Sequence, residues 1–165
     1  MMMKKAFFPS TILLLTLFST LSHDALGSVD ALLRWKASLR SHNTTILLPS
    51  WTDQSTMSGC SWYGVSCDAH GSIRRLNLSS SGLIGTLDRF SFSSFPNLTH
   101  FELSLNYFSG IIPSEISYLS NLVYLDFSSN QFSGTIPPEI GHLRKLDTLH
   151  LFDNRFISGS IPEAI

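Results

Sequence analysis

The chain has 165 residues, of which 43% are hydrophobic and 14% are charged, and its formal net charge is −1. This composition suits one globular or solenoid domain and excludes a disordered tail. The charge is near neutral and Lys and Arg never cluster beyond a pair, which argues against electrostatic binding of nucleic acid.

Residues 1–27 are typical of a secretory signal peptide, because two lysines precede an apolar segment and small residues stand at Ala25 and Gly27. The alternatives are a signal anchor or a buried helix, but Pro9 and several Ser and Thr shorten the apolar run and favour cleavage. Beyond this segment no apolar run reaches about 18 residues, so we expect no transmembrane span in the mature chain. The chain should therefore enter the secretory pathway and reach the extracellular space.

Secretion gives meaning to three N-glycosylation sequons, which begin at Asn43, Asn77 and Asn97. Asn43 lies in a polar connector and is the strongest candidate for a glycan. Asn77 falls on an expected strand, where a glycan would remove that strand from use unless the sequon stays unoccupied.

The segment after the signal peptide combines a predicted helix with a cysteine pair. The residues from Ser28 to Arg40 show an amphipathic pattern, and Ser28 is the expected N-cap of the helix. Cys60 and Cys67 enclose a short loop with two aromatic residues and a glycine. In an oxidising compartment this spacing predicts a disulfide, whereas a zinc site would need further ligands at typical spacings.

The chain from Leu98 to Ile165 repeats itself, with equivalent leucines 24 residues apart. The slots read L-x-x-L-x-L-x-x-N-x-L-x-G-x-I-P-x-x-I-x-x-L, with Phe at positions 101, 108, 127, 132 and 156. Apolar residues at every fixed slot of such a period predict a solenoid of leucine-rich repeats, and the recurring Gly and Pro exclude amphipathic helices. The predicted coils are residues 73–97, 98–121, 122–145 and 146–165, the first atypical and the last incomplete.

Two coils depart from the pattern. In the first coil Leu87-Asp88 replaces Ile-Pro and Ser81 replaces the recurring Asn, which we interpret as accommodation to a neighbouring cap. In the last coil one extra residue, Ile157, follows Asn154 before the glycine, and we interpret it as a bulge on the convex side.

The repeat slots predict the fold. Alternation in L-x-L buries one face of a strand, so stacked coils should form a parallel β-sheet on the concave face. The recurring side-chain amides of Asn106, Asn130 and Asn154 can hydrogen-bond backbone groups that the strands no longer pair. The sequence therefore predicts an α/β leucine-rich-repeat solenoid with a helical, disulfide-bonded cap at residues 28–70, because the first coil would otherwise expose its apolar end.

A motif in the predicted cap reads Ala31-Leu32-Leu33-x-Trp35-Lys36-x-Ser38-Leu39, then Trp51, then Cys60-x-Trp62-x-Gly64-Val65-x-Cys67. With the L-x-G-x-I-P form of the repeat, it closely resembles the N-terminal part of the ectodomain of plant leucine-rich-repeat receptor-like kinases and receptor-like proteins. The resemblance implies an extracellular recognition module that binds a peptide or protein ligand or a co-receptor ectodomain, without the kinase in this chain. In a longer receptor, it would lie on the outer side of the plasma membrane.

The alternative is a complete small secreted protein that acts as an adaptor or as an inhibitor. Polygalacturonase inhibitors use the same repeat, although their caps carry more cysteines. Because the sequence stops inside a coil, we expect a truncated product or a partial gene model.

Residues between the buried slots of each strand should point to the concave face and form columns across the coils. The binding candidates on this face are His100, Glu102, Tyr124, Asp126, His150 and Phe152. Aromatic and charged side chains are often mixed in recognition patches. The alternative is a solvated face that has no partner on these coils.

The sequence offers no constellation that predicts catalysis. It contains no G-x-S-x-G, no Gly-rich phosphate loop, no H-E-x-x-H and no C-x-x-C. Its histidines are scattered and its acidic residues are spread singly, so we expect no catalytic residues, no cofactor and no metal site.

Overall fold

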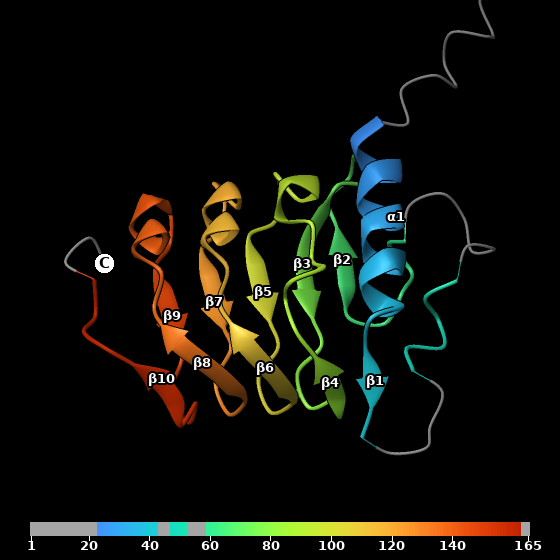
Figure 1. The fold of residues 1–165 in the computed structure, drawn as a ribbon. Coiled ribbons are helices and arrows are strands. Elements are labelled where there is room, and N and C mark those ends of the chain that lie inside the picture. The colour runs from blue at the N-terminus through green and yellow to red at the C-terminus, as the bar shows by residue number, and fades with distance from the viewer. Residues whose placement is uncertain (1–22, 43–46, 53–58, 163–165) are drawn as a thin grey trace, which may run out of the picture.

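The structure is a computed structural model that describes residues 23–42, 47–52 and 59–162. The predicted signal peptide up to residue 22 and the sequon at Asn43 lie outside the described residues. Within the described ranges, no helix is long and apolar enough to cross a membrane. The cap and the coils form one stack, with the helix of the cap at one end and the coils following side by side (Figure 1).

The described part of the cap contributes one helix and two short strands: α1 (His23–Lys36), β1 (Arg40–Ser41) and β2 (Val65–Cys67). The prediction of a helix from Ser28 to Arg40 is wrong at both ends. Ser28 is not an N-cap, because it lies within α1 rather than at its start. Its buried side chain donates a hydrogen bond to the carbonyl of Ser94 at 2.6 Å. The helix ends before Arg40 because this residue pairs with the first coil instead.

The disulfide between Cys60 and Cys67 is confirmed. Beside it, the rings of Trp51 and Trp62 stack with their centroids 5.4 Å apart. The indole N–H of Trp51 also donates to the carbonyl of Tyr63 at 2.9 Å. The cysteine loop and the preceding connector are thus packed together as one unit at the end of the stack.

Five strands form the sheet on the concave face, in the order β2-β3-β5-β7-β9. Those of the coils are β3 (Ile73–Asn77), β5 (His100–Glu102), β7 (Tyr124–Asp126) and β9 (Thr148–His150). β2 pairs antiparallel with β3, and the other neighbours are parallel. The central residues Leu76, Phe101 and Leu125 are completely buried, so the alternating pattern gives one buried and one open face.

The sequence reading did not predict the second sheet, which follows the order β1-β4-β6-β8-β10. The strands that the coils contribute to this second sheet are β4 (Leu83–Gly85), β6 (Tyr107–Ile111), β8 (Gln131–Thr135) and β10 (Phe156–Ser158). They occupy the L-x-G-x-I part of the repeat, where Phe108 and Phe132 are buried. Gly110 and Gly134 adopt φ angles of 82° and 80°, a left-handed conformation that favours glycine. The recurring glycine therefore allows the left-handed conformation that the backbone adopts within β6 and β8.

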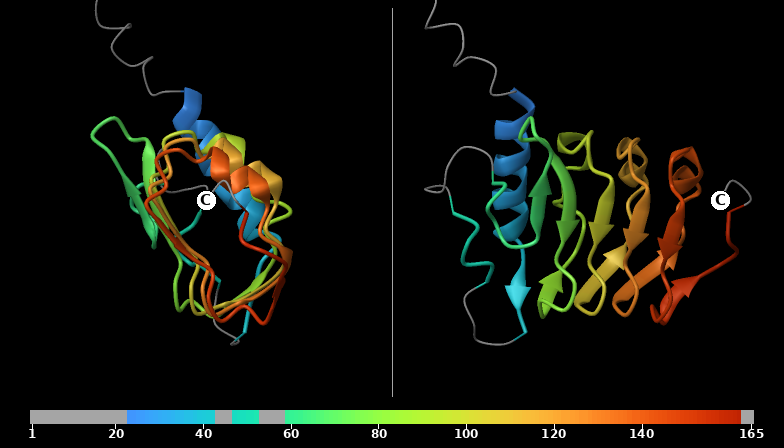
Figure 2. Two further views of the ribbon diagram at one scale, coloured as in Figure 1. Left: turned by 90° about the vertical axis from the view of Figure 1, so that its left-hand side faces the viewer. Right: turned by 180° about the vertical axis from the view of Figure 1, so that it is seen from behind.

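In the described residues, three short 3-10 helices form the outer wall, on the side of the coils opposite the concave sheet (Figure 2, left). They are η1 (Phe92–Ser94), η2 (Ser114–Tyr118) and η3 (Pro138–His142). Pro113 and Pro137 precede η2 and η3 in an extended conformation and have no N–H that needs a partner. η1 is shorter and follows the first coil's Leu87-Asp88 instead of Ile-Pro.

A hydrophobic core continues from the cap into the coils. Trp35 of α1 packs edge-on against Phe90 and stacks on Phe108, with centroid distances of 4.9 and 5.8 Å. Its indole N–H donates to the carbonyl of Thr86 at 3.0 Å. Because burying one such ring stabilises a fold by roughly 1.5–3 kcal/mol, this aromatic cluster fixes the cap to the first two coils.

The recurring asparagines Asn106, Asn130 and Asn154 are buried and form a ladder of hydrogen bonds along the stack. The Oδ1 of Asn130 accepts from the N–H of Phe108 at 2.9 Å. Its Nδ2 donates to three carbonyls, those of Leu103, Phe127 and Ser128. The Leu103 carbonyl also accepts from Asn106, and the Phe127 carbonyl also accepts from Asn154, so shared carbonyls link successive coils.

The extra residue of the last coil does not lie where the sequence suggested. Ile157 pairs with Gly134 and is packed against the core, in the slot that Phe132 fills opposite Gly110 one coil earlier. Phe156 is instead 63% exposed. Both the assignment of Phe156 to a core slot and the reading of Ile157 as the bulged residue are wrong. One inserted residue reverses which side chains of a strand face inward, so the larger ring is turned outward.

Candidate functional site

The parallel register of the concave sheet places the predicted binding residues of successive coils next to one another. His100 pairs with Tyr124, and Glu102 pairs with Asp126. Asp126 pairs in turn with His150 of the last coil. All five are partly exposed, and they come from three different strands. Since neighbouring strands lie about 4.8 Å apart, three coils present a surface roughly 10 Å wide.

Four rings on this face follow one another in a continuous series, which we call the aromatic row: His100, Tyr124, His150 and Phe152. His100 and Tyr124 stack with centroids 5.9 Å apart. Tyr124 meets His150 edge-on at 5.7 Å, and His150 contacts Phe152 at 5.6 Å. The Tyr124 hydroxyl also lies 3.4 Å from Nδ1 of His150. Phe152 is 60% exposed, so the row ends in a large apolar side chain that is open to solvent.

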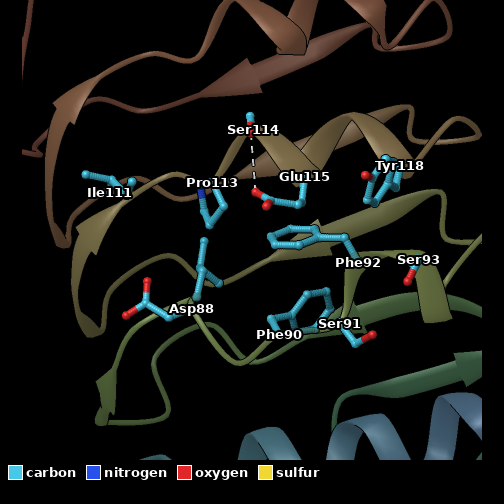
Figure 3. Close-up of a pocket in the computed structure, with 11 residues that line it drawn as sticks. Asp88, Phe90, Ser91, Phe92, Ser93, Ile111, Pro113, Ser114, Glu115 and Tyr118 are labelled. Atoms are coloured by element: carbon cyan, nitrogen blue, oxygen red, sulfur yellow. Dashed lines mark hydrogen bonds between the residues drawn. The ribbon is translucent and has the colours of Figure 1, made fainter.

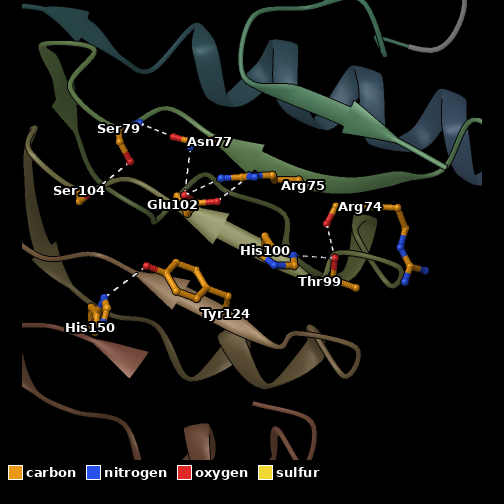
Figure 4. A network of polar contacts seen from close by, with 10 residues as sticks. All are labelled: Arg74, Arg75, Asn77, Ser79, Thr99, His100, Glu102, Ser104, Tyr124 and His150. Atoms are coloured by element: carbon orange, nitrogen blue, oxygen red, sulfur yellow. Dashed lines mark hydrogen bonds and ion pairs between the residues drawn. The ribbon is translucent and has the colours of Figure 1, made fainter. Parts of the chain in front are cut away.

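A polar network occupies the same face on the first two coils (Figure 4). The Nη2 of Arg75 and the Nδ2 of Asn77 each donate to Oε2 of Glu102 at 3.0 Å. The Nε of Arg75 lies 2.7 Å from Oε1, an ion pair whose alignment is not that of a hydrogen bond. The Glu102 side chain is only 12% exposed. The charge of Glu102 is therefore matched within the protein, which leaves this residue less available to a ligand than the aromatic row.

Tyr124 and Asp126 combine a neutral donor with a carboxylate. Burial raises the pKa of the Tyr124 hydroxyl, and the negative charges of Asp126 and Glu102 raise this pKa further. Tyr124 therefore keeps its proton across the physiological range and can donate a hydrogen bond to a ligand. One oxygen of Asp126 accepts from the N–H and the hydroxyl of Ser128, which holds the carboxylate in place.

Continued alternation along the strands would also place a column of serines on the open face ahead of Phe152, at positions 79, 104 and 128. The structure does not offer them to a ligand. Ser104 and Ser128 are buried. The hydroxyl of Ser104 donates to the hydroxyl of Ser79, and that of Ser128 donates to Asp126. No sequence signal could show this, because the strand ends at Glu102 and Asp126 and the alternation of faces stops there.

The remaining predicted site residues are dispersed. The amide nitrogen of Asn77, to which a glycan would be attached, belongs to the polar network. Asn97 is partly exposed in the turn before β5. Among the described residues, no group of three or more His, Cys, Asp or Glu side chains could hold a metal ion. Glycan occupancy at both sites stays a prediction.

Comparisons with protein families divide the chain into the two parts seen in the fold. Residues 25–68 match the leucine rich repeat N-terminal domain, and residues 71–132 match the leucine rich repeat family. MDIS1-interacting receptor like kinase 2 of Arabidopsis thaliana is 50% identical over 84 residues, which cover 50% of this chain and 8% of that protein. The chain thus spans less than a tenth of the length of this relative.

Solved structures of plant ectodomains share the fold. The BIR2 ectodomain from Arabidopsis thaliana is 35% identical, with a TM-score of 0.74 over 83% of this chain and 72% of that chain. The HAESA ectodomain from Arabidopsis, in complex with an N-terminally extended IDA peptide hormone, is 28% identical. Its TM-score is 0.70 over 85% of this chain and 23% of that chain. Each of these matches covers the cap as well as the coils.

Proposed function

We propose that this chain, which belongs to the leucine-rich-repeat proteins of the plant receptor-like kinase type, is an extracellular recognition module that binds a peptide or protein on its concave sheet. The observation that carries this proposal is the aromatic row, which lies open beside the carboxylate of Asp126. Extended sheets of solenoids are binding surfaces in many repeat proteins. The peptide hormone bound to the related HAESA ectodomain supports a peptide as one kind of ligand.

The geometry supports binding of a short extended segment across the coils. Tyr and other aromatic side chains supply contact area with little loss of conformational entropy. A surface roughly 10 Å wide accommodates about three residues of an extended peptide, at about 3.3 Å for each residue. Tyr124 would donate to a backbone carbonyl of this segment, and Asp126 would accept from an N–H or pair with a basic side chain.

The module would recognise its partner without catalysing a reaction. The related HAESA ectodomain was solved in complex with a peptide hormone, and BIR3 was solved in complex with SERK2, which supports a binding role. The location is extracellular, as for the ectodomains of these relatives. A leucine-rich-repeat ectodomain of a co-receptor is the second class of partner for the same face.

The test is a binding screen with the secreted chain immobilised. The probes are a synthetic library of secreted plant peptides and a panel of purified leucine-rich-repeat ectodomains. We expect at least one probe to bind, and Tyr124→Ala or His150→Ala to weaken it by about tenfold or more. Arg144→Ala, an exposed change outside the concave sheet, should leave the affinity unchanged. Equal affinities for all the variants would contradict the proposal, and so would the absence of any bound probe.

A further inference from the structure

The outer wall carries a groove of about 570 Å³ between the first and second coils (Figure 3). Phe90 and Phe92 form its apolar floor and are almost completely buried. Ile111 and Tyr118 stand on its rim, where they are 57% and 58% exposed. An apolar floor below two exposed apolar side chains is an arrangement found at protein contact sites.

The groove exists because the first coil departs from the repeat. Its outer wall is formed by the three-residue η1, whereas the second coil has the five-residue η2. The small side chains of Ser91 and Ser93 line the groove on the first coil. The short η1 and these small side chains therefore leave room for a groove beside η2.

The repeat itself does not require exposed apolar residues at the rim. In the next coil, Thr135 occupies the position equivalent to Ile111, and His142 occupies the position equivalent to Tyr118. Both of these polar residues are also exposed. Since the fold accepts polar side chains at both slots, Ile111 and Tyr118 are not needed for packing of the coil.

The charged residues that line the groove are both acidic. Asp88 lies at one side of the groove and Glu115 at the other, and both are exposed. Asp88 accepts a hydrogen bond from the hydroxyl of Thr86, and Glu115 accepts one from the hydroxyl of Ser114. Among the described residues, neither carboxylate takes part in an ion pair. The described lining contains no Lys, Arg or His. Charge complementarity therefore favours a basic group next to the apolar floor.

We propose that this groove is a second docking site, which binds a protein segment that carries an aliphatic or aromatic residue next to a lysine or arginine. The apolar side chain would lie over Phe92 between Ile111 and Tyr118. The basic side chain would reach Asp88 or Glu115. Tyrosine is enriched at the centres of protein interfaces, where a few anchors supply most of the affinity. This site is separate from the concave face, so the chain could hold two partners at once.

The experiment selects ligands from a phage-displayed library of random dodecapeptides, with the secreted chain as bait. The double variant Ile111→Thr/Tyr118→His, which copies the next coil, serves for counter-selection. We expect the selected peptides to share an apolar residue next to Lys or Arg, and their synthetic forms to bind the double variant about tenfold or more weakly. The isosteric variant Asp88→Asn/Glu115→Gln should weaken these peptides, but should have little effect on analogues in which the basic residue is alanine.

Two controls make the outcome specific. Tyr124→Ala, which alters the aromatic row, should bind the selected peptides with unchanged affinity, so failure at one surface is distinguished from failure at the other. Thermal unfolding of the groove variants should be the same as that of the unchanged chain. Peptides that lack a basic residue, or that bind the double variant as well as the unchanged chain, would overturn the proposal. Displacement of the peptides by a neutral oligosaccharide such as cellohexaose would assign the groove to sugars instead.

Discussion

Replacement of Asn130 by alanine tests whether the asparagine ladder holds the coils together. The buried amide makes four hydrogen bonds, but its loss does not affect the four partners equally. The carbonyls of Leu103 and Phe127 each keep another asparagine as a donor, and that of Ser128 keeps a backbone N–H. The N–H of Phe108 is the group left without its partner.

The expected loss of stability follows from this difference between the four hydrogen-bond partners of Asn130. A buried N–H without a partner costs about 1–3 kcal/mol, and the other lost hydrogen bonds contribute about 1 kcal/mol net. We therefore expect Asn130→Ala to lower the free energy of unfolding by about 2–4 kcal/mol. Gln131→Ala is the matched control, because Gln131 is the exposed residue next to Asn130, at the start of β8, and should change the stability by less than about 0.5 kcal/mol.

The assay is urea unfolding of the secreted chain, followed both by tryptophan fluorescence and by circular dichroism. The described tryptophans report the cap, whereas circular dichroism reports both sheets, so loss of the coils alone would separate the two transitions. If Asn130→Ala and Gln131→Ala unfold at the same urea concentration, the ladder does not stabilise the stack and the reasoning is refuted.

Three further predictions concern single backbone and side-chain positions. Leu105 is 61% exposed and adopts a φ of 57°, a left-handed conformation that costs an ordinary residue roughly 1–2 kcal/mol. Leu105→Asn should therefore raise the free energy of unfolding by up to about 1 kcal/mol. An unchanged or lower free energy in urea unfolding would contradict this prediction. Gly64→Ala should unfold the cap, because the new Cβ would lie 2.2 Å from the carbonyl oxygen of Asn77. Gly71 has a similar φ of 77° but open space around it, so Gly71→Ala should lower the free energy of unfolding by only about 1 kcal/mol. Equal melting temperatures for the two variants would refute the steric argument. Tyr124 should titrate above 10.0 in ultraviolet absorbance, measured as the difference from Tyr124→Phe, and Asp126→Asn should lower its pKa. The folded chain holds this proton more tightly than the unfolded chain, so Tyr124 should reduce stability as the pH rises past about 10, and titration at or below 10.0 would contradict the assigned environment.

The sequence predicts the parts of this fold that depend on periodic burial. The slots at Leu76, Phe101 and Leu125 alternate with open positions, and their burial defines the concave sheet without further information. The disulfide was equally predictable, because Cys60 and Cys67 are the only cysteines and lie close in sequence. Both features depend on local spacing alone.

Features that depend on contacts between coils were not predictable from the same pattern. The second sheet occupies the L-x-G-x-I segment, and its strands are stabilised by neighbours one coil away. Whether Phe156 or Ile157 fills the core slot depends on the register of β10, and a single inserted residue shifts this register. The end of the helix before Arg40 depends on pairing of Arg40 and Ser41 with the first coil. In each case tertiary pairing outweighs the local signal.

The polar network changes the consequence of a glycan at Asn77. The sequence suggests that this glycan would remove the first strand from the binding face. In the structure Arg75 and Asn77 already use their side chains to hold Glu102, so the first strand offers little to a ligand in either case. The aromatic row begins one coil later, at His100, and extends away from Asn77. Glycosylation at Asn77 and binding at the row are therefore compatible, because the network commits one end of the sheet to internal contacts and leaves the other end for recognition.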